Sequence, residues 1–399
     1  MTASLPLEGV RVLDLSTVFM GPYAAQILAG WGAEVIKVEA LEGDQVRGIG
    51  DVGRTGLGPI FINANGGKRS LALDLKAAGA REVLHALVRR TDLLLHNVRP
   101  PAAARLGITW EDLSVVNPSL VHCAFRGYGA GGPWADRPAY DDVIQAGSGV
   151  AMAQAVGGAE PAYWRSAVAD KVMGIYGAAA ACAALRSRDV TGEGRAVEVP
   201  MFEAMAAFML LDRQGGWVTD PPNGPTGYPR TDSPHRRPYA TKDGYLAVMI
   251  YADKQWLSFF RLIGRTDLGD DPRFHDINAR TRHIDELYAL LANEIATRTT
   301  AEWEAAFEEA DIPHGPVNTI EDLFSDPQLV ATDFFQTIHQ PGMGPVRLAR
   351  SPIDMGVPAA APRPAPRLGE HTREILAEAG FAAEEITQLH DDRVVASAD

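Results

Sequence analysis

The first part of the chain alternates short apolar runs with segments of helical periodicity. Residues 9–15 and 33–40 have the pattern of buried strands, and residues 23–31 between them have that of a helix. A strand, a helix and a second strand in such quick succession are typical of a parallel β-α-β unit. The alternation continues, with strands predicted at 70–75, 92–97 and 120–125 and helices predicted at 77–90 and 110–116.

This alternation predicts an open α/β sheet of Rossmann type, in which ligands bind beyond the carboxyl ends of the strands. Three segments fall at those ends: Ser16–Gly21, Asn97–Arg105 and the stretch from Gly127 onward. We therefore expect the functional residues of the first half to lie in these segments.

The second half has a different pattern. It predicts a buried helix at 172–185, a strand at 197–202 and a helix at 203–213. A Pro- and Gly-rich loop at 219–238, a hairpin at 239–251 with its turn at Asp243-Gly244, and helices at 254–263, 279–297 and 300–310 follow. The chain is expected to return at 315–317, to be β-like at 341–357, to form a proline-rich linker at 358–372 and to close with a helix at 372–380.

These elements predict two domains. Residues 1–218 form the first part of a large Rossmann-like domain, residues 219–325 form a linker and a smaller α+β domain, and residues 326–399 return to complete the large one. A length of 399 residues is also more typical of two domains than of one.

Asp170 lies in the stretch that opens the predicted buried helix, AVADKVMG (167–174). A carboxylate at or just before the first turn of a helix is stabilised by the unpaired N–H groups and by the helix dipole. It is expected to stay ionised there, as a nucleophilic carboxylate must be. Two interpretations remain open from these residues: Asp170 caps the helix, or it carries chemistry.

Composition narrows the class of protein. The formal net charge of −14 argues against a general nucleic-acid binder, which usually has a basic face. Cys123 and Cys182 have no CxxC partner and are expected to be core residues of a protein in a reducing compartment. No signal peptide, no apolar run of about 18 residues and no metal-binding motif is recognised, so we expect a cytoplasmic protein without membrane or metal.

Other candidate motifs have simpler explanations. The GYGAGG run at 127–132 fits a dinucleotide-binding pattern, but Pro133 follows where a helix should open, which indicates a glycine-rich loop. Basic residues gather at the predicted strand ends, either as surface charge or as phosphate ligands; they are Lys68, Arg69, Lys76, Arg99 and Arg105. The pair Asp141-Asp142 could hold a metal ion, but it is expected instead to cap a helix that begins there.

The ordered motifs of the chain resemble those of the family III CoA-transferases, the group of formyl-CoA transferase and carnitine CoA-transferase. The resemblance runs from Leu7 to about Val395. It includes LEGVRVLDLS, GPYAAQILAGWGAEVIKVEA, NANGGKRSLALDLK, DLLLHNVRPPAAARLG, NPSLVHCAFRGYGAGGP, YDDVIQAGSG, AVADKVMGIYGAA, TGEGRAVEVPMFEA, DIPHGPVNTIEDLFSDPQL and LGEHTREIL.

The resemblance implies an enzyme that moves CoA from an acyl-CoA donor to a carboxylic acid, with Asp170 as nucleophile. The aspartate passes through a mixed anhydride and an aspartyl-CoA thioester, and CoA is a substrate, so no cofactor is bound permanently. The family pattern also implies an interlocked homodimer. It implies CoA contacts at Phe19, Met20, Leu73, Asp74, Leu75, Lys76, Asn97, Val98, Arg99, Arg105, Pro138, Ala139, Tyr140 and Asp141.

The sequence departs from the formyl-CoA transferases at several places. These enzymes have glutamine, arginine and lysine where this chain has Phe19, Ala40 and Pro138, and a run of four glycines that is absent from 215–240. The departures favour an acceptor with an apolar body over oxalate. Two alternatives are a 2-methylacyl-CoA racemase, whose histidine is replaced here by Tyr140, and a non-catalytic acyl-CoA-binding protein.

Overall fold

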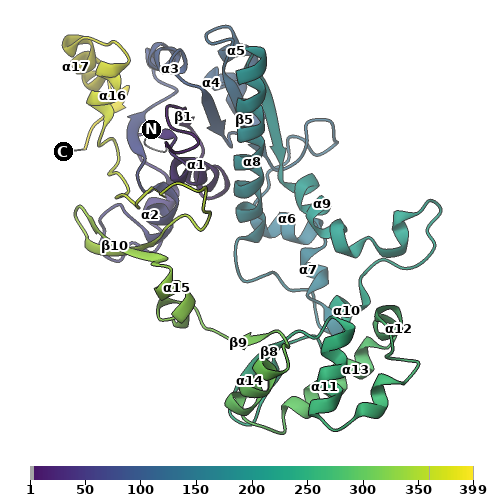
Figure 1. Ribbon diagram of the computed structural model, residues 1–399. Helices are drawn as coiled ribbons and strands as arrows, with labels where there is room; N and C mark the ends of the chain where they lie inside the picture. The colour runs from purple at the N-terminus through teal and green to yellow at the C-terminus, as the bar shows by residue number, and fades with distance from the viewer. Residues whose placement is uncertain (1–3, 359, 399) are drawn as a thin grey trace. The chain divides into compact units, whose positions relative to one another are not determined.

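A computed structural model describes residues 4–358 and 360–398. The chain divides into two compact units (Figure 1). The first comprises the chain up to Ser148, Trp164–Ala206 and the chain from Pro327 onward, and the second comprises Gly149–Tyr163 and Ala207–Asp326. The domain boundaries at 218 and 325 stay a prediction.

The first unit is built on a seven-stranded sheet with the order β12-β3-β2-β1-β4-β5-β6. The strands are β1 (Arg11–Asp14), β2 (Glu34–Glu39), β3 (Arg69–Leu73), β4 (Leu93–His96), β5 (Val121–Arg126), β6 (Arg195–Pro200) and β12 (Val395–Ala396). All neighbours pair in parallel except β12, which is antiparallel to β3. The order reverses between β1 and β4, which makes their carboxyl ends the place where a ligand is expected in such a sheet.

Most helices of this unit match predicted ones, but those at 59–65, 100–106, 327–331 and 383–391 were not predicted. The helices are α1 (Met20–Gly30), α2 (Pro59–Asn65), α3 (Ala80–Val88), α4 (Pro100–Leu106), α5 (Trp110–Ser114), α6 (Asp141–Gly147), α8 (Val168–Thr191), α15 (Pro327–Ala331), α16 (Thr372–Glu378) and α17 (Ala383–Asp391), together with α9 (Met201–Arg213), whose residues from Ala207 onward belong to the second unit. The prediction of a mixed α/β fold with a large parallel sheet is confirmed.

The sheet is covered on both faces. On one face the apolar side chains of α3 and α16, among them Leu84 and Ile375, pack with Leu13 and Leu71 of the strands. Successive residues of a strand point to opposite faces. On the other face α8 packs against β5 and α1, where a Cβ on Gly177 would lie 2.3 Å from the Phe125 ring.

The helix α8 is the long apolar element that the sequence pattern indicates. Its length and composition would allow it to cross a membrane, and half of its most apolar window is buried in the protein. It packs along α1, β5, β6 and α6. A buried core helix can be as long and as apolar as a membrane-spanning one. The packing of α8 against these elements therefore explains its apolar composition.

The second unit has a three-stranded antiparallel sheet and a cluster of helices. Its elements are α7 (Val150–Ala153), α10 (Pro229–Asp232), β7 (Tyr239–Ala240), β8 (Tyr245–Val248), α11 (Asp253–Leu262), α12 (Ile277–Arg282), α13 (Ile284–Ile295), α14 (Thr300–Glu309) and β9 (His314–Pro316). The predicted hairpin with its turn at Asp243-Gly244 is confirmed. Trp303 stacks on Phe307 in the core at 5.0 Å between ring centroids.

Several predicted elements are wrong in detail. The helix predicted at 279–297 is broken at His283, whose backbone leaves the helical region. Residues 314–316 do not start the return; they form β9 and pair with β8. The β-like stretch at 341–357 is only the second arm of an antiparallel hairpin, β10 (Phe335–Gln340) and β11 (Gly344–Ala349).

The chain also does not end with the helix at 372–380. After α16 come α17 and the edge strand β12, in which Val395 pairs with Leu73. A strand of two residues is too short to show alternation. The strand β12 therefore forms the edge of the large sheet next to β3.

Candidate active site

Asp170 is the third residue of α8, in its first turn. The residue that caps the helix is Ala167, and no side chain caps it from that position. The interpretation of Asp170 as the N-cap is therefore wrong. Its carboxyl group is left for another role.

The N-terminal half of α8 lies close to α1 because two of its residues are glycines. A Cβ on Gly174 would meet the Tyr23 ring of α1 at 2.5 Å. A Cβ on Gly177 would lie 2.3 Å from the Phe125 ring of β5. The two glycines therefore bring the helix that carries Asp170 against the helix that begins at Met20.

Asp141 lies beside Asp170, although 29 positions separate them in the sequence. Its Oδ1 accepts a hydrogen bond from the backbone N–H of Asp170 at 3.0 Å. Its Oδ2 accepts one from Gln145, one turn further along α6. Asp141 was expected to cap α6; it instead satisfies an unpaired N–H in the first turn of α8.

The electrostatic state of Asp170 differs from the expectation. Burial, with the negative charge of Asp141 as a second cause, raises the pKa of Asp170 to about 7. The helix N-terminus thus does not keep this carboxyl group fully ionised, because removal from water disfavours its charged form. Protonated and ionised forms coexist near neutral pH.

The loop after β1 is held by a buried ionic network that was not predicted. Asp14 forms an ion pair with Lys68 at 2.9 Å, and Lys37 forms one with Asp44 at 3.1 Å. Lys37 Nζ also donates to the Ser16 carbonyl. Asp44 accepts from the backbone N–H of Val18, a residue with a positive φ of 71°.

This network fixes the start of α1. Phe19 is the residue preceding the helix and Met20 is its first residue, so both follow directly on the restrained Val18. A buried ion pair needs a partner for each charge. A sequence signal was available, because Lys37 and Glu39 interrupt the apolar run of β2 with charged residues.

The predicted CoA contacts at the ends of β3 and β4 lie on the same edge of the sheet. Leu73 is the last residue of β3, and its side chain is in the core, so only its main chain can face a ligand. Asp74 accepts a hydrogen bond from the Lys76 N–H at 3.0 Å. Asn97 hydrogen-bonds Thr17 of the loop after β1.

The basic residues divide into two groups. Lys68 is buried and bound to Asp14, and Arg69 forms ion pairs with Glu34, Glu374 and Glu378. These two are structural, and the prediction that they could bind phosphate is wrong. Lys76, Arg99 and Arg105 are exposed and form no ion pair within residues 4–358 and 360–398.

The remaining predicted contacts precede α6. The glycine-rich stretch after β5 is a loop and not the start of a helix. Its ends meet, because a Cβ on Gly127 would lie 2.5 Å from that of Ala139. Pro138 is exposed, and Tyr140, 74% exposed, is the residue before α6. The last two predicted CoA contacts, Leu75 and Val98, lie two residues after the ends of β3 and β4.

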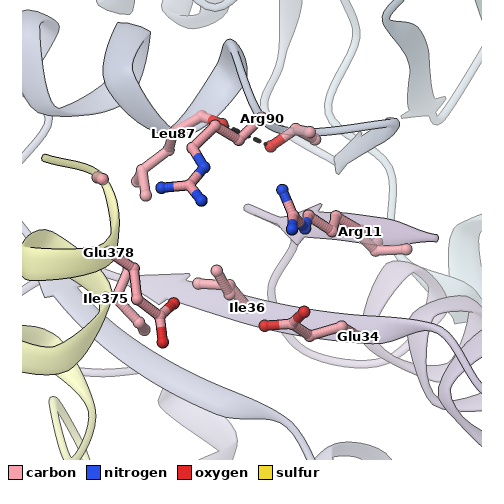
Figure 2. Close-up of a pocket in the computed structure, with 10 residues that line it drawn as sticks. Arg11, Glu34, Ile36, Leu87, Arg90, Ile375 and Glu378 are labelled. Carbon is pink, nitrogen blue, oxygen red and sulfur yellow. Dashed lines mark hydrogen bonds between the residues drawn. The ribbon is translucent and has the colours of Figure 1, made fainter. Parts of the chain in front are cut away.

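A cavity of about 220 Å³ opens at the other end of the sheet (Figure 2). It is bordered by Arg11 and Glu34, the first residues of β1 and β2, and by Arg90 and Glu378. Asp170 and the candidate contacts do not line it. No group of three or more His, Cys, Asp or Glu side chains suited to a metal ion occurs among the described residues.

The chain matches the model of CoA-transferase family III over residues 7–372. It is a family III CoA-transferase. The chain is 32% identical to (R)-2-hydroxy-4-methylpentanoate CoA-transferase of Clostridioides difficile, covering 98% of this chain and 99% of that protein. It is also 32% identical to succinate–glutarate CoA-transferase of Agrobacterium fabrum, covering 94% and 95%.

Solved structures agree with the assignment to this family. A CAIB/BAIF family protein from Brucella suis superposes with a TM-score of 0.79 at 29% identity, covering 94% of this chain and all of that one. A family III CoA-transferase is a transferase with an acyl-CoA substrate and a carboxylic acid acceptor. The predicted family and class of enzyme are therefore confirmed.

Proposed function

We propose that Asp170 is the nucleophile through which this enzyme transfers CoA. The observation that carries the proposal is a partly buried carboxyl group in the first turn of α8 whose pKa is raised to about 7. Such a group is ionised in a large fraction of molecules at neutral pH and is more basic than an exposed aspartate. Both properties suit attack on a thioester.

The proposed reaction proceeds by exchange at acyl carbons. An Asp170 oxygen attacks the carbonyl carbon of the donor thioester, the C–S bond breaks, and CoA leaves as thiolate. The thiolate then attacks the aspartyl carbonyl of the mixed anhydride, which releases the donor acid and leaves an aspartyl-CoA thioester. The acceptor carboxylate reverses these steps, so no permanently bound cofactor takes part.

Two substitutions test this role. Asp170→Ala and Asp170→Asn are both expected to keep the fold and CoA binding and to abolish transfer. Hydroxylamine added to the wild-type enzyme with an acyl-CoA donor should convert Asp170 to a hydroxamate, read by peptide mass spectrometry. Transfer at the wild-type rate by either variant contradicts the proposal.

We propose that CoA lies along the carboxyl edge of the sheet. Its phosphates are bound by Lys76, Arg99 and Arg105, three exposed cations at this edge that form no ion pair in the described part of the chain. Arginine and lysine are the usual ligands of phosphate. Charge reversal at Arg99, measured by CoA titration calorimetry, should weaken binding strongly, whereas reversal at Lys254, an exposed residue of the second unit, should not.

The acceptor proposed here is a carboxylic acid with an apolar body. Phe19, which directly precedes α1, gives the first loop an aromatic side chain and no hydrogen-bonding group for a second carboxylate. The relative from Clostridioides difficile is named for a branched hydroxy acid. A screen of acyl-CoA donors against mono- and dicarboxylic acids, read by mass spectrometry, tests this class; preference for oxalate contradicts it.

We further propose that the enzyme is an interlocked homodimer of the cytoplasm. Support comes from the return of the chain to the first unit at Pro327 and from Cys123 and Cys182, which are both free thiols. Light scattering of a folded monomer at micromolar concentration contradicts the dimer. Recovery of the native protein in a membrane or secreted fraction contradicts the location.

A further inference from the structure

We propose that Asp141 is a positioning residue for the nucleophile: its carboxylate fixes the first turn of α8 and, by repelling ionised Asp170, favours the uncharged covalent forms of that residue. This inference rests on the proposed role of Asp170. It gives Asp141 a role beyond the helix cap and the CoA contact that were expected from the sequence.

The geometry gives Asp141 a fixed orientation. One carboxylate oxygen accepts from the Asp170 N–H at 3.0 Å and the other accepts from Gln145 Nε2. Since both oxygens are used, the carboxylate has one preferred orientation, and it is anchored to the backbone of the nucleophile itself.

Gln145 is the anchor of this arrangement. Its side chain is 1% exposed. Its Oε1 accepts from the Trp164 N–H at 2.8 Å, and its Nε2 also donates to the Ser166 carbonyl at 3.2 Å. The amide therefore joins α6 to the segment that enters α8, and a polar group this deeply buried is held by its hydrogen bonds.

The charge of Asp141 is the one that acts on Asp170. Burial raises the pKa of Asp170 first, and the Asp141 charge raises it further. The other titratable groups of α8 and of the elements packed against it add nothing to this shift. They are Tyr23, His122, Cys123, Arg126, Asp142, Lys171, Tyr176, Cys182, Arg186, Arg188, Asp189, Arg195 and Glu198.

The consequence follows from the charge balance of the proposed steps. When the Asp170 oxygen attacks the thioester, a C–O bond forms, the C–S bond breaks, and the electron pair leaves with CoA thiolate. In the anhydride, and in the thioester that replaces it, Asp170 carries no charge. Each covalent form therefore removes the repulsion between two adjacent carboxylates, which destabilises only the free ionised enzyme.

The test compares Asp141→Asn with a matched control, Asp142→Asn. Asp142 lies in the same first turn of α6, is exposed, and makes no hydrogen bond or ion pair within the described residues. Each enzyme is incubated with an acyl-CoA donor at about pH 8.5, where Asp170 is ionised. Hydroxylamine is then added, and the fraction of Asp170 hydroxamate is measured by peptide mass spectrometry.

We expect wild type and Asp142→Asn to give the same labelled fraction and Asp141→Asn to give about tenfold less. The acid limb of the pH–rate profile should shift to lower pH in Asp141→Asn alone. Asp141→Glu, which restores a carboxylate, should recover part of both effects. A residue that served only structure would change the melting temperature without moving the acid limb.

The outcomes separate this inference from the proposed function. Equal labelling and an unmoved acid limb in Asp141→Asn overturn the role of Asp141 while leaving Asp170 as the nucleophile. Absence of any hydroxamate at Asp170 in the wild type overturns the proposed function itself. If Asp141→Asn does not fold, Asp141→Ser, a smaller neutral side chain that still offers an acceptor, is carried through the same measurements.

Discussion

The Asn97 side chain and the Thr17 backbone are joined by two hydrogen bonds. Asn97 Oδ1 accepts from the Thr17 N–H at 3.0 Å, and Asn97 Nδ2 donates to the Thr17 carbonyl at 2.8 Å. Asn97 follows β4 and Thr17 belongs to the loop after β1, so this pair spans the point at which the strand order reverses. It ties together two of the segments proposed to bind CoA.

Asn97→Ala should loosen this connection. With both hydrogen bonds lost, about 1–2 kcal/mol, the KM for acyl-CoA should rise severalfold to tenfold with a small change in kcat. Asn117→Ala is the control, because Asn117 donates in the same way to two carbonyl groups, those of Val88 and Thr91. It should lower stability and leave KM unchanged; an equal rise of KM in both variants contradicts the assignment.

A second prediction concerns the buried pair of Lys68 and Asp14. Lys68→Met leaves the Asp14 carboxylate buried without its partner, so the free energy of unfolding should fall by about 3–5 kcal/mol. The exposed pair of Lys254 and Asp311 is the comparison. Lys254→Met should change stability by less than about 1 kcal/mol in urea unfolding. If both variants lose a similar free energy of unfolding, the burial of the Lys68–Asp14 pair does not determine its contribution to stability.

The sequence predicted the alternation of β1 to β5 with α1, α3 and α5, but not α2, α4, α15, α17 or β12. Periodicity reports which residues are buried, and the runs of β1 and β2 are apolar enough to show it. The position of Asp170 in the first turn of α8 was also predictable. The pairing of Asp141 with the Asp170 backbone was not, because periodicity gives no distance between residues 29 positions apart.

The ionic network illustrates the same limit. Lys68 was assigned to the group of possible phosphate ligands because it is a basic residue at a predicted strand end. In the fold it turns inward, to Asp14, Asn65 and the Pro22 carbonyl. Whether a lysine at a strand end is exposed or buried depends on partners brought in by other segments, and the local sequence does not contain them.

The third prediction links the chemistry of Asp170 to stability. Its pKa is about 7 in the folded protein and lower, about 3.9, in the unfolded chain. The folded state therefore binds the proton more tightly between these values, and the stability that this contributes is present at low pH and lost as pH rises through 7.

Asp170→Asn removes this dependence. The variant should be more stable than wild type by about 1–2 kcal/mol at pH 8, after allowance for partial exposure to solvent, and equal to it near pH 4. Urea unfolding at the two pH values measures the difference. Asp142→Asn should show no such gain. If Asp170→Asn is the less stable protein at pH 8, the raised pKa of Asp170 is contradicted.

The fourth prediction concerns the contact between α8 and β5. Replacement of glycine by alanine inside a helix usually stabilises it by about 1 kcal/mol. At Gly177 the added Cβ would lie 2.3 Å from the Phe125 ring, so Gly177→Ala should instead destabilise by about 1–3 kcal/mol. Ala179→Gly, at an exposed position of the same helix, should cost only the usual propensity. Thermal unfolding distinguishes the two, and a stabilised Gly177→Ala contradicts this packing.

The last prediction separates the transferase from a racemase of the same fold family. Racemisation needs an acid and a base on opposite sides of the α-carbon. Tyr140 stands where the resemblance places the histidine of the racemases, and a phenol lacks the basic ring nitrogen with which an imidazole accepts a proton. His122 does not substitute for it: its ring is buried in β5, 2.8 Å from the Ile108 carbonyl.

His122 also points to the wrong face of the sheet. Residues of a strand alternate between faces, so His122 lies opposite to Phe125, the residue against which α8 packs. The enzyme should therefore leave the α-carbon of a 2-methylacyl-CoA untouched when incubated in deuterium oxide without an acceptor acid. Enzyme-dependent deuterium at that carbon, with loss of configuration, would make racemisation the primary activity, and Tyr140→Phe would then show whether the tyrosine takes part.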